Sequence, residues 1–178
     1  GMCHWHRSSR FCPRCGEATQ VLDAGHQKKC LNPSCGFPQF PRTDPAVIML
    51  VHDGDHVVLG RQQRWPPGMH SILAGFVEPG ESLEDTVIRE VKEEVGIDVE
   101  HPQYESSQPW PFPSSLMLGF RSIATPGQSL TVNTEELESA RWFSRKELKQ
   151  SPENEDFRMP RKDSIARRLL DEWLAEDN

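Results

Sequence analysis

The sequence has no long apolar run. The longest, AVIMLV at residues 46–51, is far shorter than the roughly 18–20 apolar residues that a membrane-spanning helix needs, so we expect no membrane partner. The start of the chain also lacks the basic segment followed by an apolar one that is typical of a secretory signal. We therefore expect a cytoplasmic protein.

The sequence also has little positive charge. Its 178 residues carry a net charge of −7, which argues against a protein that wraps nucleic acid by bulk charge. Residues 1–43 hold six basic residues against two acidic ones, a net charge of +4 that leaves −11 for the remainder. Such an acidic body fits a protein that holds cations, and a well-solvated surface explains most of its carboxylates equally well.

Cysteine is scarce, but four of the five cysteines form two close pairs, Cys12 with Cys15 and Cys30 with Cys35. Pairs at this spacing indicate metal thiolates in a reducing compartment rather than disulfides. Four thiolates complete a tetrahedral structural site for one Zn²⁺ at about 2.3 Å. We expect three other potential ligands to lie in a frayed terminus: Cys3, His4 and His6.

The composition changes near residue 44, from Cys, Gly, Pro and basic residues to short apolar runs separated by turns. We expect a disordered or tag-derived N-terminus at residues 1–9, a zinc ribbon at 10–43 and a larger domain at 44–178. The apolar runs predict strands at 46–51, 56–60, 71–77, 116–124, 129–132 and 140–144. Residues 61–70 predict a loop, and helices are expected at 82–96, 163–176 and briefly after 144.

The helix at 82–96 gathers negative charge on one face. Glu90, Glu93 and Glu94 stand at helical positions i, i+3 and i+4, which share a face. Like charges so placed repel by a few tenths of a kcal/mol per pair. A divalent cation bound among these carboxylates replaces their repulsion with attraction to the cation. Mg²⁺ is commonly held by carboxylates together with a substrate phosphate.

The residues around this cluster resemble the Nudix box over residues 75–97, GFVEPGESLEDTVIREVKEEVGI. The resemblance implies an α/β/α sandwich that hydrolyses a nucleoside diphosphate linked to another group. It implies that Glu90, Glu93 and Glu94 hold divalent ions and that Glu93 or Glu94 deprotonates the attacking water. By the same resemblance, Arg89 pairs with a box carboxylate such as Glu81. The structural positions of the box are Gly75, Glu81, Arg89 and Gly96.

Residues 107–115, SQPWPFPSS, form a second distinctive segment. Three alternating prolines make it stiff and extended and exclude a central strand, and we expect Trp110 and Phe112 to pack into the core. The segment, together with a preceding four-cysteine module, resembles the NADH pyrophosphatase subgroup of the Nudix family. The four-cysteine module, the Nudix-like box and the proline segment follow one another in the order found in that subgroup. Together they cover the chain from about residue 10 to residue 174.

The subgroup resemblance implies further site residues. Glu136 corresponds to a late metal-binding glutamate, with Glu135 as the alternative. Phe76 corresponds to an aromatic that stacks on the nicotinamide, and Phe40 to one that reaches into the partner subunit's site of a homodimer. The full set of implied substrate contacts is Phe40, Ala74, Phe76, Gln108, Ser115 and Ala166. Many relatives carry a further domain before the zinc module, which here is absent or was cut off. If that domain normally supports the dimer, the expectation of a homodimer weakens.

The function implied is cleavage of NADH or NAD⁺ into a nicotinamide mononucleotide and AMP, with two or three Mg²⁺ or Mn²⁺ ions in the site and one structural Zn²⁺. Removal of NAD caps from RNA ranks second, because the cationic zinc segment offers RNA only a local surface. Two alternatives stay open. One is a Nudix hydrolase of ADP-ribose or diadenosine polyphosphates, and the other is a non-catalytic regulator that binds nucleotide or nucleic acid.

Overall fold

A computed structural model describes residues 1–151 and 153–176. The last two residues of the domain expected at 44–178 lie outside that range. The chain divides into two compact units. The first comprises Gly1–Asp44 and Trp110–Leu116, and the second comprises Pro45–Pro109 and the chain from Met117 onward. None of the helices among the described residues is long and apolar enough to cross a membrane.

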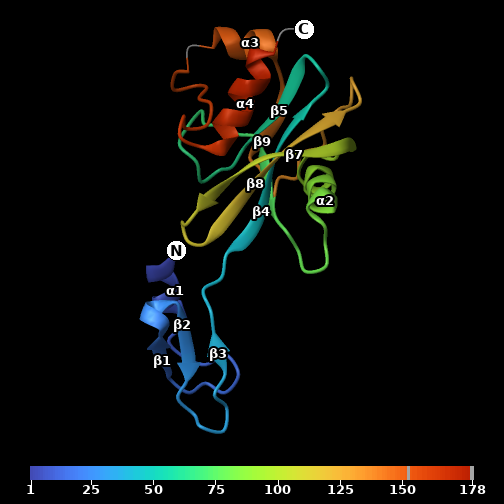
Figure 1. The fold of residues 1–178 in the computed structure, drawn as a ribbon. Coiled ribbons are helices and arrows are strands. Elements are labelled where there is room, and N and C mark those ends of the chain that lie inside the picture. The colour runs from blue at the N-terminus through green and yellow to red at the C-terminus, as the bar shows by residue number, and fades with distance from the viewer. Residues whose placement is uncertain (152, 177–178) are drawn as a thin grey trace. The chain divides into compact units, whose positions relative to one another are not determined.

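The first unit is built on a small antiparallel sheet, β1 (Thr19–Leu22), β2 (Gln27–Cys30) and β3 (Pro38–Gln39), in the order β1-β2-β3. A 3₁₀ turn, η1 (Asp23–Gly25), joins the first two strands. Helix α1 (Met2–Ser8) precedes them, and Figure 1 shows it in dark blue at the N-terminus.

The expectation of a disordered stretch at residues 1–9 is wrong, because α1 occupies Met2–Ser8. Its Trp5 is buried, and the ammonium of Lys28 lies 5.2 Å from the centroid of the Trp5 ring. The same ammonium donates hydrogen bonds to the carbonyl oxygens of His6 (2.9 Å) and Ser9 (2.8 Å). One tryptophan and one lysine therefore attach α1 to β2, a long-range contact that the sequence pattern of a seven-residue segment does not reveal.

The second unit contains a six-stranded sheet in the order β7-β8-β4-β5-β9, with β6 paired to β4. Its strands are β4 (Asp44–His52), β5 (His56–Arg61), β6 (Leu73–Phe76), β7 (Val99–Trp110), β8 (Ser115–Ala124) and β9 (Ser139–Ser144). The hairpin expected from residues 46–51 and 56–60 is confirmed, because β4 and β5 pair antiparallel on either side of a short turn.

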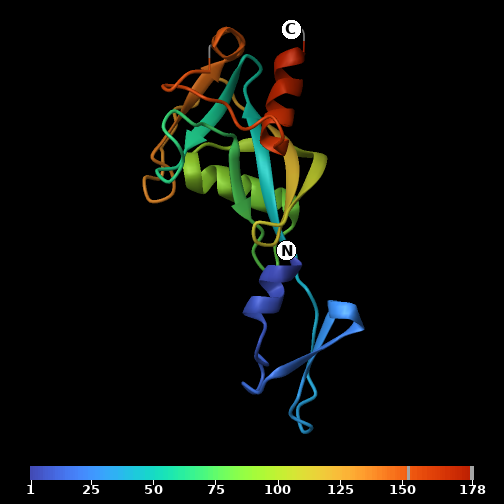
Figure 2. The same cartoon turned by 90° about the vertical axis from the view of Figure 1, so that its left-hand side faces the viewer.

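Helices cover both faces of this sheet, as Figures 1 and 2 show for the second unit. They are α2 (Leu83–Val95), α3 (Arg145–Gln150) and α4 (Ile165–Ala175). Alternate residues of β4 point to opposite faces, so that Val47 and Met49 pack in one core cluster with Val91 of α2. Ile48 packs in a second cluster with Trp173 of α4. The expected α/β/α sandwich is confirmed.

The long helix α2 begins and ends as its sequence predicts. The Ser82 hydroxyl accepts a hydrogen bond from the backbone N–H of Asp85 at 3.1 Å, an N-cap. Gly96 ends the helix with φ +74°, a conformation that glycine adopts at little cost. A Cβ at this position would also lie 2.9 Å from Cβ of Thr131. Both caps fix the register of the helix, and thereby the direction in which its glutamates point.

Two segments differ from their predictions. Residues 129–132 form no strand. Their apolar side chains Leu130 and Val132 instead pack against the first core cluster, and the Thr131 N–H donates to the Val95 carbonyl at 2.8 Å. The proline segment contributes the end of β7, an edge strand in which proline removes no necessary ladder bond. Phe112 in the following turn is 75% exposed, so its predicted core packing is wrong.

Candidate active site

Helix α2 and strand β6 border a cleft of about 590 Å³ in the second unit. Glu90 and Glu94 project into it from α2, and they are 8% and 3% exposed. Glu136, from the turns before β9, supplies a third and exposed carboxylate. One carboxylate oxygen from each of the three lies within 4.8 Å of the other two. The structure thus brings together three of the four predicted metal ligands.

Gly75 makes room for this cluster. A Cβ built on Gly75 would lie 1.8 Å from the carboxyl carbon of Glu90, closer than any non-bonded pair of carbons tolerates. Gly75 pairs with Val47 of β4, so the sheet fixes its backbone and only a residue without a side chain fits. The backbone of β6 therefore forms the wall against which the Glu90 carboxylate lies.

The turn that carries Glu136 is tied to α2. The Asn133 backbone N–H donates to the Glu94 carbonyl at 2.9 Å, and the Asn133 side-chain amide donates to Glu136 Oε1 at 3.1 Å. These bonds place Glu136 in the cluster. Glu135 is not a member of it, so the geometry favours Glu136 over that alternative.

Burial dominates the electrostatics of the cluster. It raises the pKa of Glu94 to about 8, and the nearby charges of Glu90 and Glu136 add to the effect. Burial also raises the pKa of Glu90, although Arg89 opposes the shift. Within the described part of the chain, the Oε2 atom of Glu94 is buried and has no hydrogen-bond partner. A hard divalent cation would satisfy that oxygen and offset the repulsion, so the residues fit an oxygen-ligated metal.

Arg89 connects the start of α2 to the cleft wall. Its guanidinium donates to Glu81 from Nε (2.5 Å) and Nη2 (2.9 Å), and to the Phe76 carbonyl from Nη2 (3.0 Å). Hydrogen bonds from Arg89 hold the pKa of Glu81 at about 2, well below its usual range. The pairing that the resemblance implies is therefore present.

Glu93 stands apart from the cluster. Its carboxylate accepts from Arg89 Nη1 at 2.8 Å, its side chain is 51% exposed, and its oxygens are not among those that converge. The shared helical face predicted from sequence holds for Glu90 and Glu94, which differ by four residues. Glu93 pairs with Arg89, whose Nη1 also donates to Glu90 Oε1 at 2.9 Å.

The predicted substrate contacts fall in several places. Ala74 and Phe76 line the cleft, and Phe76 is 60% exposed there. Gln108 is engaged elsewhere: its side-chain amide donates to the Asp163 carbonyl at 2.8 Å and accepts from the Ile165 N–H at 2.7 Å. The amide of Gln108 therefore fixes the start of α4.

Two other predicted contacts have structural surroundings. Ala166 is buried in the second core cluster. Ser115 begins β8 and is half-buried. Neither environment by itself indicates a ligand.

The four paired cysteines gather in the first unit. Their sulfur atoms all lie within 4.8 Å of one another, with Cys12 and Cys35 at 3.8 Å and Cys15 and Cys30 at 3.4 Å. A tetrahedron with metal–sulfur bonds of about 2.3 Å has edges of about 3.8 Å. The thiols are free of disulfides, and their spacing suits a single structural Zn²⁺.

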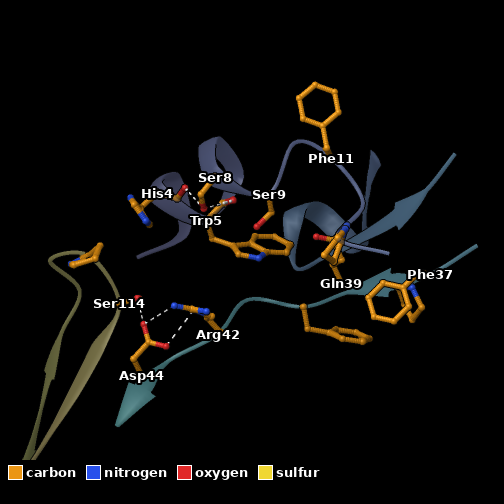
Figure 3. A pocket seen from close by; sticks show the side chains of 14 residues that line it. His4, Trp5, Ser8, Ser9, Phe11, Phe37, Gln39, Arg42, Asp44 and Ser114 are labelled. Atoms are coloured by element: carbon orange, nitrogen blue, oxygen red, sulfur yellow. Dashed lines mark hydrogen bonds and ion pairs between the residues drawn. The ribbon is translucent and has the colours of Figure 1, made fainter. Parts of the chain in front are cut away.

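The first unit also contains a groove of about 710 Å³, shown in Figure 3. Phe11 and Phe37 lie along it, and Phe40 lines it with 62% of its surface exposed. At one end, Asp44 accepts hydrogen bonds from Ser114 (2.7 Å) and Arg42 (3.4 Å).

A group of cleft residues on the loop between β5 and β6 was not predicted from the sequence. Gln62, Gln63 and Arg64 line the cleft, and Glu78 lines it from the segment after β6. The available signal was a loop rich in long polar side chains, placed just before the strand that opens the Nudix-like box.

Comparisons with known proteins agree with this geometry. A family model described as NUDIX domain matches residues 42–167, and one described as NADH pyrophosphatase zinc ribbon domain matches residues 7–40. The chain is similar to the Homo sapiens NAD-capped RNA hydrolase NUDT12, with 43% identity over 96% of this chain and 39% of the relative. It is 46% identical to the Pseudomonas aeruginosa NAD-capped RNA hydrolase NudC, over 96% of this chain and 58% of the relative.

Among solved structures, a NUDIX hydrolase from Nitrosomonas europaea matches with a TM-score of 0.73 and 21% identity, over 93% of this chain and 90% of that one. This likeness concerns the fold alone. The chain spans less than two thirds of the length of the two curated relatives described above.

Proposed function

Because this chain belongs to the Nudix domain family, we propose that it hydrolyses the diphosphate bond of NADH or NAD⁺ and releases a nicotinamide mononucleotide and AMP. The observation that carries the proposal is the convergence of Glu90, Glu94 and Glu136 in a cleft that also exposes an aromatic ring. The zinc ribbon of the NADH pyrophosphatase type ahead of this domain favours a dinucleotide over other Nudix substrates.

We assign the three clustered glutamates to two or three Mg²⁺ or Mn²⁺ ions. When bound, such ions would supply charge neutralisation at the phosphate oxygens and at the leaving group. The four cysteines would hold one Zn²⁺ with a structural role. The chemistry of each donor set separates the two kinds of metal, since carboxylates suit hard cations and thiolates suit zinc.

We propose Glu94 as the base that takes a proton from the attacking water. Its carboxylate is buried in the cleft beside Glu90 and Glu136, which would place a proton acceptor next to a water held against the diphosphate. Glu93, the alternative base, is tied to Arg89 and more exposed, so its proposed part is to support the metal site from outside. Water would add to one phosphorus while the bridging P–O bond breaks.

Substrate positioning would come mainly from β6. Phe76 presents an exposed ring beside the metal cluster, which suits stacking on a nicotinamide or adenine. Ala74 and the backbone of Gly75 would form the floor beneath it. Contacts from Phe40, Gln108, Ser115 and Ala166 stay predictions of the resemblance.

The same site would act on a dinucleotide attached to the 5′ end of an RNA, an activity that the names of both curated relatives describe for those proteins.

We further propose a homodimer, supported by the exposed aromatics Phe11 and Phe40 along the groove of Figure 3. A cytoplasmic location is proposed from the free thiols of the zinc module. Sedimentation analysis tests the dimer.

Product identification tests the function. The full chain is incubated with NADH, NAD-capped RNA, ADP-ribose and diadenosine tetraphosphate, each with Mg²⁺ and with Mn²⁺, and the products are separated by chromatography. We expect AMP and a nicotinamide mononucleotide from NADH at the highest rate. Preferred cleavage of ADP-ribose or the diadenosine compound would assign another Nudix specificity. Binding without cleavage of any substrate would support the regulator alternative.

A further inference from the structure

The cleft is strongly asymmetric in charge. Four carboxylates line it, those of Glu78, Glu90, Glu94 and Glu136. Among the described residues that line it, Arg64 supplies the one permanent positive charge. A diphosphate entering this cleft meets repulsion from every acidic side chain that a metal does not neutralise, so an attractive charge within reach strongly affects binding.

The guanidinium of Arg64 is available for a ligand. Its Nε donates to Gln62 Oε1 at 2.8 Å, which orients the planar group. Its two terminal nitrogens have no hydrogen-bond or ion-pair partner anywhere in residues 1–151 or 153–176. Arg61 and Arg89, by contrast, have terminal nitrogens that donate to carbonyls or carboxylates. Arg64 therefore presents an unused fork, the arrangement that binds phosphate through two parallel hydrogen bonds.

The loop that carries Arg64 is fixed at its first residue. Arg61, at the end of β5, donates from Nη1 to the Pro66 carbonyl (2.5 Å) and from Nη2 to the Trp65 carbonyl (3.1 Å). Its Nε pairs with Glu138 at 2.9 Å. The Trp65 N–H closes a turn onto the Gln62 carbonyl at 3.0 Å. These bonds hold both ends of the short segment that includes Arg64.

The far end of the loop is fixed as well. The Arg158 N–H donates to the Gly68 carbonyl at 2.8 Å, and the His70 N–H donates to the Arg158 carbonyl at 2.9 Å. Gly68 has φ +72°, and a Cβ on it would lie 2.3 Å from the Glu155 carbonyl oxygen. A loop held at both ends loses little conformational entropy when its arginine engages a ligand.

We propose that Arg64 binds the diphosphate of the substrate and sets the preference of the cleft for ligands that carry a charged phosphate bridge. The inference rests on the proposed function for the identity of the substrate, but the recognition of a phosphate rests on the cleft itself. Arg64 is a binding residue that touches the diphosphate. Glu90, Glu94 and Glu136 act on the same group from the metal side.

Three variants of the full chain test the inference. Arg64→Gln removes the charge and retains a polar side chain, and Arg64→Lys keeps the charge without the planar fork. Arg168→Gln is the matched control, because Arg168 is exposed on α4 and pairs with Glu172 at 2.8 Å. Initial rates with NADH and Mg²⁺ give kcat and KM. Calorimetric titration with inorganic pyrophosphate and Mg²⁺ gives a dissociation constant without turnover.

We expect Arg64→Gln to lower kcat/KM by about 10–100-fold and to weaken pyrophosphate binding by a similar factor, the effect of losing charged hydrogen bonds. Arg64→Lys should retain part of the kcat/KM and part of the affinity for pyrophosphate that Arg64→Gln loses. Arg168→Gln should stay within about twofold of the parent protein, and the three variants should melt within a few degrees of it. If the role of Arg64 were purely structural, Arg64→Gln would lower the melting temperature, and Arg64→Lys would not restore kcat/KM or pyrophosphate binding.

The two proposals fail in distinguishable ways. If the parent protein does not cleave NADH, the proposed function fails, and pyrophosphate binding still decides the role of Arg64. If Arg64→Gln binds pyrophosphate and cleaves NADH within about twofold of the parent protein, the inference about Arg64 is overturned and the proposed function stands.

Discussion

Replacing Glu94 by glutamine should make the protein more stable and less active at once. Burial and the charges of Glu90 and Glu136 raise the pKa of Glu94 to about 8 in the folded state, whereas an exposed glutamate in the unfolded chain titrates near 4.3. Between these values the folded state binds a proton that the unfolded state releases. Stability is therefore lost as the pH rises from about 4.5 to about 8, and the full cost is present above pH 8.

The size of this cost follows from the shift. One pKa unit corresponds to about 1.36 kcal/mol, so the rise to about 8 sets a ceiling near 5 kcal/mol. Relaxation of the site and entry of water reduce such costs severalfold, and we expect about 2 kcal/mol. Glu94→Gln removes the charge with little change of shape. Its gain in unfolding free energy should be near zero at pH 4 and reach about 2 kcal/mol at pH 8.5.

Urea unfolding at several pH values measures this gain, in buffers without added Mg²⁺ or Mn²⁺. Glu84→Gln is the control, since Glu84 is exposed in the first turn of the same helix, and it should change stability by a few tenths of a kcal/mol. Cleavage of NADH by Glu94→Gln should fall by about 10²–10⁴-fold. A variant that is destabilised at pH 8.5 would refute the burial argument, and one that retains activity within threefold would refute the proposed catalytic role of Glu94.

Changes at Gly75, at Arg89 and at the zinc module each alter a contact described above. Gly75→Ala drives a methyl group into the Glu90 carboxylate, so we expect a loss of about 1–3 kcal/mol in urea unfolding and a fall in kcat that added Mg²⁺ does not restore. Arg89→Lys gives up the hydrogen bonds to Glu81 and the Phe76 carbonyl. Acid titration followed by circular dichroism should then show unfolding at higher pH, because the depressed pKa of Glu81 stabilises the fold down to about pH 2. Removing zinc with a chelator should unfold the first unit, with a red shift of tryptophan fluorescence from the buried Trp5, and unchanged fluorescence would contradict a structural metal.

Local sequence signals predicted the parts of the fold whose boundaries are set by neighbouring residues. Helix α2 begins at its serine cap and ends at Gly96 as expected, and β4 was recognisable as a continuous apolar run. The error at residues 129–132 has a physical cause. Alternating apolar residues indicate that one face of a segment is buried, but not what buries it. Here Leu130 and Val132 are buried by packing beside the end of α2 and not by pairing in a sheet.

The candidate site was predictable in its composition but not in its arrangement. Helical spacing places Glu90, Glu93 and Glu94 near one another, yet it cannot show that the oxygens of Glu93 stay outside the converging group while they pair with Arg89. Glu136 came from resemblance, because its position depends on the bonds of Asn133 across the fold.

Arg64 was missed for a related reason. Its loop acquires a defined shape only through the tertiary hydrogen bonds of Arg61. A sequence pattern identifies residues 61–70 as a loop but does not indicate which of its side chains faces the cleft.

The attachment of α1 to β2 also provides an internal reporter. Lys28 is 3% exposed beneath Trp5, and burial lowers the pKa of its ammonium. Its sequence neighbour Lys29 lies on the opposite face of the strand and is exposed. An amine-selective acylating reagent would therefore label Lys29 in the intact molecule. Label on Lys28, detected by mass spectrometry, would show that the first unit with its four paired cysteines has unfolded.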